Sequence, residues 1–236
     1  MSVTRSRASG SIAILAAALP LGGCGGPLSM LDPAGPAARH VSSLWWAMFF
    51  GAAFLFALVM VLLAIAARRP RLLAAWSERS WLVAGGLVLP ALVLPPLTVY
   101  GLMIGERATP VASADVLRVE AVGRRWLWEF AYPEQASGDA RTRTVLHIPA
   151  GRPVDVHIRS EDVIHSFWVP RLAGKMDAIP GHVNVLRIQV DQPGVYRGVC
   201  AEFCGLEHAT MNFEVRAHPG GDYANALRDA LEGTRP

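Results

Sequence analysis

Two long apolar runs constrain the fold of this chain more than any other feature of its sequence. The first covers residues 41–67, the second covers residues 81–104, and neither contains a charged side chain. Each is long enough to cross roughly 30 Å of hydrocarbon as a helix, and this uninterrupted length argues against a helical hairpin buried inside a soluble core. We therefore predict two transmembrane helices. Pro90, Pro95 and Pro96 predict a kink or break in the second, tolerated because partner helices pack against it.

The segment between the two runs predicts how the chain is oriented. Residues 68–80 read RRPRLLAAWSERS and contain four arginines. Because basic loops beside transmembrane helices remain in the cytoplasm, we predict a cytoplasmic hairpin at 68–80, with both ends of the chain on the opposite side. Residues 106–236 contain 17 acidic and 15 basic residues. The basic excess of the chain therefore belongs to its membrane region and does not predict nucleic-acid binding.

The N-terminus has the features of a secretory signal peptide. Within residues 1–23, Arg5 and Arg7 near the start are followed by a short apolar run, and the segment ends in small residues. The sequence LGGC, which ends at Cys24, also resembles a bacterial lipoprotein box, in which the cysteine is acylated after cleavage. The alternative is a signal peptide cleaved nearby, with no role for Cys24. Residues 24–40 would then form a short segment outside the membrane before the first helix.

The pattern changes to that of a β domain over residues 108–220. Short runs such as PVDVHIRS, VNVLRIQV and NFEVRA are separated by turn sequences such as AGRP, IPGH and DQPG. This spacing predicts a β-sandwich or a Greek-key barrel. Residues 221–236 form a tail in which DYANALRDALEG predicts one short helix.

The strongest candidate site lies at residues 200–211, which read CAEFCGLEHATM. Thiolate, imidazole and thioether together are soft ligands that favour copper over magnesium, calcium or manganese. Two cysteines, each able to bridge two metals through its sulfur, favour a dinuclear site over a mononuclear one. A second histidine and one further donor would complete such a site. The candidates are His165, in the apolar turn VIHSFWVP, and the backbone carbonyl of Glu202.

Two simpler interpretations of these residues compete with copper. Cys200 and Cys204 could form a disulfide in an oxidising compartment. Two cysteines and two histidines could also hold zinc, although methionine is a poor zinc ligand. His165 or Met211 alone would more often be a core residue, and their joint placement with the thiols favours ligation. The other histidines are predicted to be structural or solvated, and they stand at positions 40, 147, 157, 182 and 218.

CAEFCGLEHATM, together with VIHSFWVPRLAGKMDAIPG, is similar to the subunit II family of cytochrome c oxidases, and the similarity covers nearly the whole chain. The resemblance implies a two-helix transmembrane hairpin followed by an all-β cupredoxin-like Greek-key barrel. It places the protein in the bacterial inner membrane, with the barrel in the periplasm. By the same resemblance the side chain of Glu202 would help to hold Mg²⁺ or Mn²⁺ at the interface with subunit I. The implied ligands of the dinuclear copper centre, CuA, are His165, Cys200, the carbonyl of Glu202, Cys204, His208 and Met211.

Two other residues acquire a role only through the resemblance. Trp126, in the string GRRWLWEFAYP, matches the position where electrons enter from cytochrome c, although the alternating aromatic residues alone would indicate a core or interface stripe. Glu78 matches a glutamate at the mouth of a proton-uptake path into subunit I, although a charge at a membrane edge is often only a solvated flank. A basic cytochrome c would dock on acidic side chains. The candidates are Glu129, Glu134, Asp139, Glu161, Asp162 and Asp177.

The resemblance therefore implies an electron-accepting oxidase subunit. Its partners would be subunits I and III and a soluble or membrane-bound cytochrome c, with oxygen reduction and proton translocation in subunit I. A related quinol-oxidase subunit would lack the thiol and histidine ligands that this sequence contains. A thioredoxin-like copper chaperone would carry its distant histidine after the cysteines in a βαβ pattern, whereas His165 precedes them here.

Overall fold

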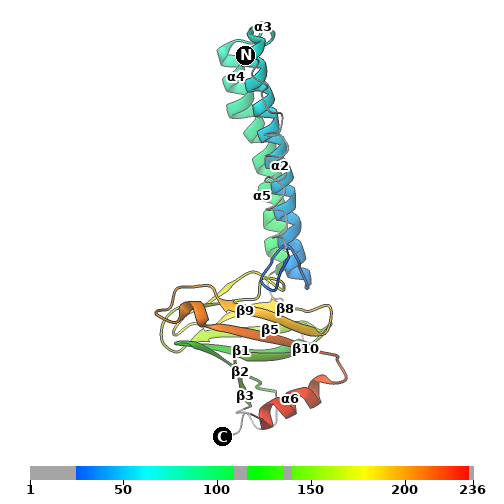
Figure 1. The fold of residues 1–236 in the computed structure, drawn as a ribbon, viewed down its shortest axis with the longest axis vertical. Helices are drawn as coiled ribbons and strands as arrows, with labels where there is room; N and C mark the ends of the chain where they lie inside the picture. Colours follow the sequence, from blue (N-terminus) through cyan, green and yellow to red (C-terminus); the bar gives the residue numbers. More distant parts are fainter. Residues whose placement is uncertain (1–24, 109–115, 135–139, 234–236) are drawn as a thin grey trace, which may run out of the picture.

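The computed structural model of the chain describes residues 25–108, 116–134 and 140–233. The predicted signal peptide at 1–23 and the predicted lipidation site Cys24 lie outside the described residues. Two long helices run side by side and meet a β domain at one end, near β8 (Asn184–Ile188), as Figure 1 shows. The fold class that the sequence predicts, a helical hairpin followed by an all-β domain, is confirmed.

The first apolar run forms a single uninterrupted helix, α2 (Pro36–Arg68). It begins five residues before the predicted membrane span, because Pro36 follows an extended Gly35 and proline is well suited to the first turn of a helix. A short helix, α3 (Pro70–Leu73), lies in the loop at the far end of the hairpin. α2 is long and apolar enough to cross a membrane, and its most apolar part is not buried within the protein.

The second apolar run is a helix with a local irregularity. It consists of α4 (Glu78–Val83), the π-helical segment η2 (Ala84–Val88) and α5 (Leu89–Ala108). The prolines therefore cause no break. The helix widens just before Pro90, where the Leu89 N–H donates to the Ala84 carbonyl, and it then continues through two further prolines. π turns of this kind accommodate irregular hydrogen bonding within a longer helix.

The β domain is a sandwich of two five-stranded sheets. In both sheets a parallel pair joins strands that are distant in sequence, so the chain crosses between the sheets and is not a simple succession of hairpins. Sheet A has the order β3 (Arg141–Arg143), β2 (Leu127–Ala131), β1 (Leu117–Arg124), β5 (Val154–Ser160), β8. Sheet B has the order β4 (Val145–Pro149), β10 (Asn212–His218), β9 (Gly194–Cys200), β6 (His165–Trp168), β7 (Met176–Ala178).

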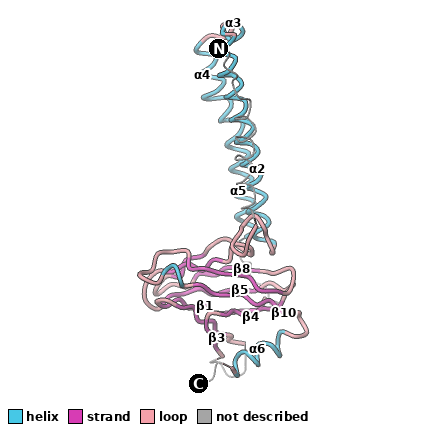
Figure 2. The backbone as a smooth tube through the Cα atoms, in the orientation of Figure 1, coloured by secondary structure: helices cyan, strands magenta, loops and turns pink. Residues whose placement is uncertain are grey.

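Aromatic side chains fill the space between the two sheets. Trp128 and Phe130 of sheet A meet Phe167 and Phe213 of sheet B, and the two latter rings stack with centroids 4.7 Å apart. These rings are buried, and burying each apolar side chain of this size stabilises a fold by about 1.5–3 kcal/mol. The strands lie across the domain, nearly at right angles to the long helices, as the tube in Figure 2 shows.

The C-terminal tail forms the predicted short helix, α6 (Tyr223–Glu232). It lies on the side of the domain away from the long helices (Figure 1) and buries Leu227 in the core. Outside the two sheets, α6 packs on the sandwich, and the long helices form the hairpin.

Backbone hydrogen bonds connect the segment before α2 to the β domain. The Ala34 N–H donates to Arg171 O at 2.7 Å, and the Asp191 N–H donates to Ala34 O at 3.0 Å. An ion pair between Arg39 and Asp191 adds to these contacts. Gly35 lies so close to the Gln189 carbonyl that a Cβ would overlap it, so glycine is required there.

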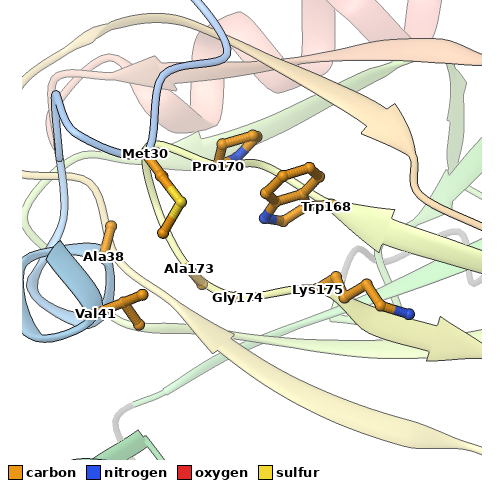
Figure 3. Close-up of a pocket in the computed structure, with 8 residues that line it drawn as sticks. All are labelled: Met30, Ala38, Val41, Trp168, Pro170, Ala173, Gly174 and Lys175. Carbon is orange, nitrogen blue, oxygen red and sulfur yellow. The ribbon is translucent and has the colours of Figure 1, made fainter. Parts of the chain in front are cut away.

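This junction leaves a pocket of about 180 Å³ between α2 and the loop that follows β6. Met30 and Val41 line it from the N-terminal side, and Trp168 and Pro170 line it from the β domain (Figure 3). Its walls are almost entirely apolar apart from Lys175 at one end.

Candidate metal centre

The predicted ligands are brought together by two segments of sheet B. β9 ends at Cys200 and β10 begins at Asn212, so the candidate loop of residues 201–211 connects two adjacent antiparallel strands. β6 lies on the other side of β9, where Phe167 pairs with Cys200. This pairing places His165, the first residue of β6, beside the loop.

The donor atoms of these residues converge within the domain. Cys200 Sγ lies 3.9 Å from Cys204 Sγ, 3.9 Å from His165 Nδ1 and 3.2 Å from Glu202 O. Cys204 Sγ lies 3.7 Å from His208 Nδ1 and 3.8 Å from Met211 Sδ. All six residues named by the sequence therefore contribute an atom to a single cluster. The two thiols and His165 alone satisfy the geometry of a metal site, with donor atoms within 4.8 Å of one another.

The two cysteines do not form a disulfide. Both are free and buried, and their sulfur atoms are 3.9 Å apart, whereas a disulfide bond requires about 2.05 Å. Each sulfur has the Nδ1 atom of an imidazole within 4 Å, so both thiolates and both imidazoles could bind metal at a single site. The donor set fits copper, because thiolate, imidazole and thioether are the soft ligands that copper prefers.

The protein environment separates the ionisation of the two thiols. Burial raises the pKa of Cys200, but hydrogen bonding with His165 and the Glu202 backbone outweighs burial and lowers that pKa below the ordinary value. Burial and the neighbouring Cys200 raise the pKa of Cys204. Without a metal the pair therefore favours one negative charge rather than two, whereas a bound metal ion would hold both as thiolates.

Asp162 is a part of the site that the sequence analysis assigned only to docking. Its Oδ1 lies 2.9 Å from His165 Nε2, so the carboxylate orients the ring with Nδ1 toward the sulfurs. The backbone N–H groups of Arg125 and Val163 also donate to it, at 2.8 and 2.6 Å. Burial opposes ionisation of Asp162, but these hydrogen bonds, led by that from His165, hold its pKa well below the usual range. A histidine that binds metal commonly has such a partner on its other nitrogen.

Gly123 also supports His165. A Cβ at this glycine would lie 2.8 Å from Cδ2 of the His165 ring, so a larger residue would displace the imidazole. On another side the ring meets the edge of Trp128, with centroids 6.1 Å apart. Only the spacing of Asp162, three residues before the histidine, could have indicated any of these contacts in advance.

Trp126 contacts the candidate loop directly. Its Nε1 donates to the Cys204 carbonyl at 3.3 Å, and its ring lies against Gly205. The predicted alternation is observed for Trp128, Phe130 and Tyr132, whose side chains are all buried in the core. Trp126 precedes β2 and is only partly buried, so it differs from these core residues in both place and exposure.

The remaining predicted residues lie apart from the sulfur cluster or at its edge. The Glu202 carboxylate is 45% exposed and points toward Lys175, with Oε2 3.6 Å from Nζ. Glu78 is exposed in the first turn of α4, at the opposite end of the long helices from the β domain. It therefore has no contact with the metal site.

His147 and His218 form a second, unpredicted histidine pair. Their rings stack with centroids 5.1 Å apart, and Nδ1 of the first lies 2.9 Å from Nε2 of the second. Burial and the neighbouring His218 lower the pKa of His147 to about 4, and burial also lowers the pKa of His218. The pair is thus held neutral, which agrees with the structural role that the sequence suggested.

Comparison with known proteins bears on the whole chain and on the site. Residues 137–218 match the family model of the cytochrome c oxidase subunit II periplasmic domain. Cytochrome c oxidase subunit 2 of Alkalihalophilus pseudofirmus is 32% identical over 146 residues, which are 62% of this chain and 42% of that protein. The chain thus spans less than half of that relative. Quinol oxidase subunit 2 of Bacillus spizizenii is 32% identical over 227 residues, which cover 90% of this chain and 69% of the relative.

Solved structures are also similar. The periplasmic domain of subunit II of cytochrome oxidase from Bradyrhizobium japonicum covers 53% of this chain and 100% of that structure, with 28% identity and a TM-score of 0.49.

Two apolar helices and a β-sandwich that carries a loop of soft donors define a membrane protein with a cupredoxin-like domain. Relatives that match most of its length extend this assignment from the domain to the whole molecule. The chain belongs to the subunit II family of haem-copper oxidases.

Proposed function

We propose that this chain is the electron-accepting subunit of a cytochrome c oxidase, which receives electrons from a cytochrome c and passes them to haem in subunit I. The observation that carries the proposal is the convergence of two thiols, two imidazoles, a thioether and the Glu202 carbonyl at one buried cluster. His165, Cys200, Cys204, His208, Met211 and the Glu202 carbonyl would hold copper there, and bound copper would supply the capacity to accept and release single electrons.

The protein's own residues supply the order that such a centre requires. Asp162 and Gly123 fix the orientation of His165, and the strand pairing of β6 with β9 fixes its distance from Cys200. Burial of both cysteines and Met211 excludes water from the sulfur atoms. A preorganised and dry set of ligands changes little during electron transfer, which keeps the barrier to that transfer low.

Further parts of the proposal concern the surroundings of the chain. The domain would lie in the periplasm of a bacterium and the arginine-containing loop of residues 68–80 in the cytoplasm, as the distribution of positive charge favours. Subunits I and III would surround the helices. The exposed Glu202 carboxylate would hold Mg²⁺ or Mn²⁺ against subunit I, and Glu78 would lie at a proton path there. Cys24 would carry a lipid.

The quinol oxidase relative supplies a second candidate function, an oxidase subunit that takes no electrons from cytochrome c. The complete set of soft donors favours the copper-containing alternative for this chain. We would then test the purified oxidase with ubiquinol as the electron donor. Reduction of the oxidase by ubiquinol without passage of electrons through the copper centre would support the quinol function instead.

Copper binding tests the proposed function directly. We expect the full-length chain, purified in detergent and supplied with copper, to bind two copper ions per chain. It should be purple, absorb in the near infrared and give a mixed-valence electron paramagnetic resonance spectrum. Binding of a single copper, or of zinc in preference to copper, would contradict the proposal, because neither uses the two thiolates as a shared bridge.

Replacement of Trp126 by phenylalanine tests the point at which electrons enter. The variant loses the hydrogen bond to the Cys204 carbonyl and part of the ring that touches the loop. We expect electron transfer from reduced cytochrome c to slow by about tenfold, equivalent to about 1.4 kcal/mol of barrier, with the copper spectrum unchanged. Trp168→Phe, in the pocket at the helix junction, serves as the control. A changed copper spectrum in Trp126→Phe would instead assign that residue a structural role.

A further inference from the structure

The surface beside Trp126 consists of arginine side chains that are more exposed to solvent than the carboxylates with which they pair. Three acidic residues, Glu129, Glu161 and Asp162, pair with the guanidinium groups of a set that we call the arginine cluster. Its members are Arg124, Arg125, Arg141, Arg143 and Arg159. Among the described residues, these pairs join five guanidinium groups to three carboxylates near the predicted point of electron entry.

In these pairs the arginine is always the more exposed partner. Arg143 is 73% exposed and its partner Glu129 is 12% exposed. Arg124 is 48% exposed against 30% for Glu161, and Arg125 is 51% exposed against 24% for Asp162. The carboxylates therefore form an inner layer, and an approaching molecule meets the guanidinium groups first. Those groups determine the sign of the potential at short range.

The strand register places the cluster on one continuous surface. Arg143 lies opposite Glu129 across β3 and β2, and Arg124 lies opposite Leu127 at the end of β1 nearest to Trp126. Arg125 directly precedes Trp126 in the chain. β3 is the edge strand of sheet A farthest from the long helices (Figure 1), so this edge of the sheet faces away from the membrane-spanning helices.

The candidate loop supplies an apolar centre beside this charged surface. Leu206 is 95% exposed and Phe203 is 77% exposed, and Gly205 between them touches the Trp126 ring. Exposed large apolar side chains next to charged ones are typical of protein interfaces, in which an apolar centre is surrounded by a polar rim. The loop also exposes two acids, Glu207 and Glu202, and the carboxylate of Glu202 pairs with Lys175.

Those acidic residues suggested for docking that the structure describes do not form one acidic surface. Glu134 is exposed, and its carboxylate accepts a hydrogen bond from the Arg118 backbone N–H at 3.4 Å. Glu129, Glu161 and Asp162 lie beneath the arginine cluster, and Asp177 pairs with Lys175 at 2.8 Å. Asp139 lies outside the described residues. A basic cytochrome c would thus meet like charge around Trp126.

We propose that the arginine cluster, with Leu206 and Phe203, is the docking surface for an electron-donor protein whose contact face is acidic. This inference rests on the proposed function, because it takes Trp126 as the place where electrons enter. Opposite charges on the two proteins would accelerate their encounter and orient the donor toward Trp126, whereas a donor with a basic contact face would be repelled.

The test uses the purified oxidase complex and two donors that differ mainly in charge. One is a basic mitochondrial-type cytochrome c, and the other is the same protein made acidic by succinylation of its lysines. Stopped-flow spectroscopy measures the second-order rate of electron transfer to the copper centre as ionic strength increases. We expect the succinylated donor to react faster at low salt, on the order of tenfold, and to slow as salt screens the attraction.

Charge variants connect this effect to the arginine cluster. The double variant Arg141→Gln and Arg143→Gln should lower the rate with the succinylated donor severalfold and weaken its dependence on salt. Arg141→Glu with Arg143→Glu should lower it further and favour the basic donor. Arg197→Glu, on β9 in the other sheet, is the matched control and should have no comparable effect. The copper spectrum of each variant reports whether the domain is folded.

Two outcomes separate this inference from the proposed function. A wild-type complex with an intact dinuclear copper spectrum that reacts faster with the basic donor would overturn the acidic-donor inference alone. A wild-type complex without that spectrum would overturn the proposed function. Equal rates with both donors at all salt concentrations would show that charge does not guide docking, and would also overturn the inference.

Discussion

Cys204→Ser is expected to abolish the dinuclear centre in the full-length chain. The Cys204 sulfur lies within 4 Å of the His208 and Met211 donors and of the Cys200 sulfur, so its loss removes a donor that all three of these groups share as a neighbour. A serine hydroxyl is a hard and weakly acidic donor that does not bridge copper as a thiolate does. Copper analysis should give at most one ion per chain, and the mixed-valence spectrum should be lost.

Met211→Leu is the graded comparison for this experiment. It removes one weak thioether donor and retains both thiols, with little change in the volume buried at this position. Two coppers should still bind, with a shifted reduction potential. Retention of two coppers and of the mixed-valence spectrum by Cys204→Ser would show that the thiols are not the bridge.

Asp162→Ala is expected to have the next largest effect, a loss of copper affinity of about 10–100-fold. The carboxylate holds His165 Nε2 and also accepts the Arg125 and Val163 N–H groups, so its removal frees the ring to turn away from Cys200. Competition with a chelator of known affinity measures the change.

Asp162→Asn and Glu161→Gln make this result specific. The asparagine retains an oxygen that can accept hydrogen bonds, so its effect should be intermediate. Glu161 is the adjacent residue, and its carboxylate pairs with Arg124 and Arg159, so its substitution should leave copper affinity unchanged. Equal affinities for wild type and Asp162→Ala would show that strand pairing alone orients His165.

Much of the site could be predicted because its ligands form a compact and unusual pattern. Cys200, Cys204, His208 and Met211 lie within twelve residues, and a loop between paired strands necessarily brings them close together. The two membrane helices were equally clear, since length and lack of charge identify them without any knowledge of packing.

The parts that could not be predicted depend on contacts between distant segments. Gly123 supports His165 because the end of β1 lies against the first residue of β6. No local sequence pattern indicates this contact. The acidic residues proposed for docking were judged by charge alone. Which member of an ion pair lies outermost depends on strand register and side-chain length, and here the longer arginines cover the shorter carboxylates.

The hydrogen bonds between the segment before α2 and the β domain affect how the helix and the domain can move relative to each other. Ala34 is hydrogen-bonded to two different loops of the sandwich, and α2 begins two residues later, at Pro36. Hydrogen bonds therefore hold the start of the first helix against the β domain, and the two are not joined by a flexible linker. Because these bonds hold the start of α2 against the domain, a tilt of this helix would move the domain, and the sulfur cluster within it, in the same direction.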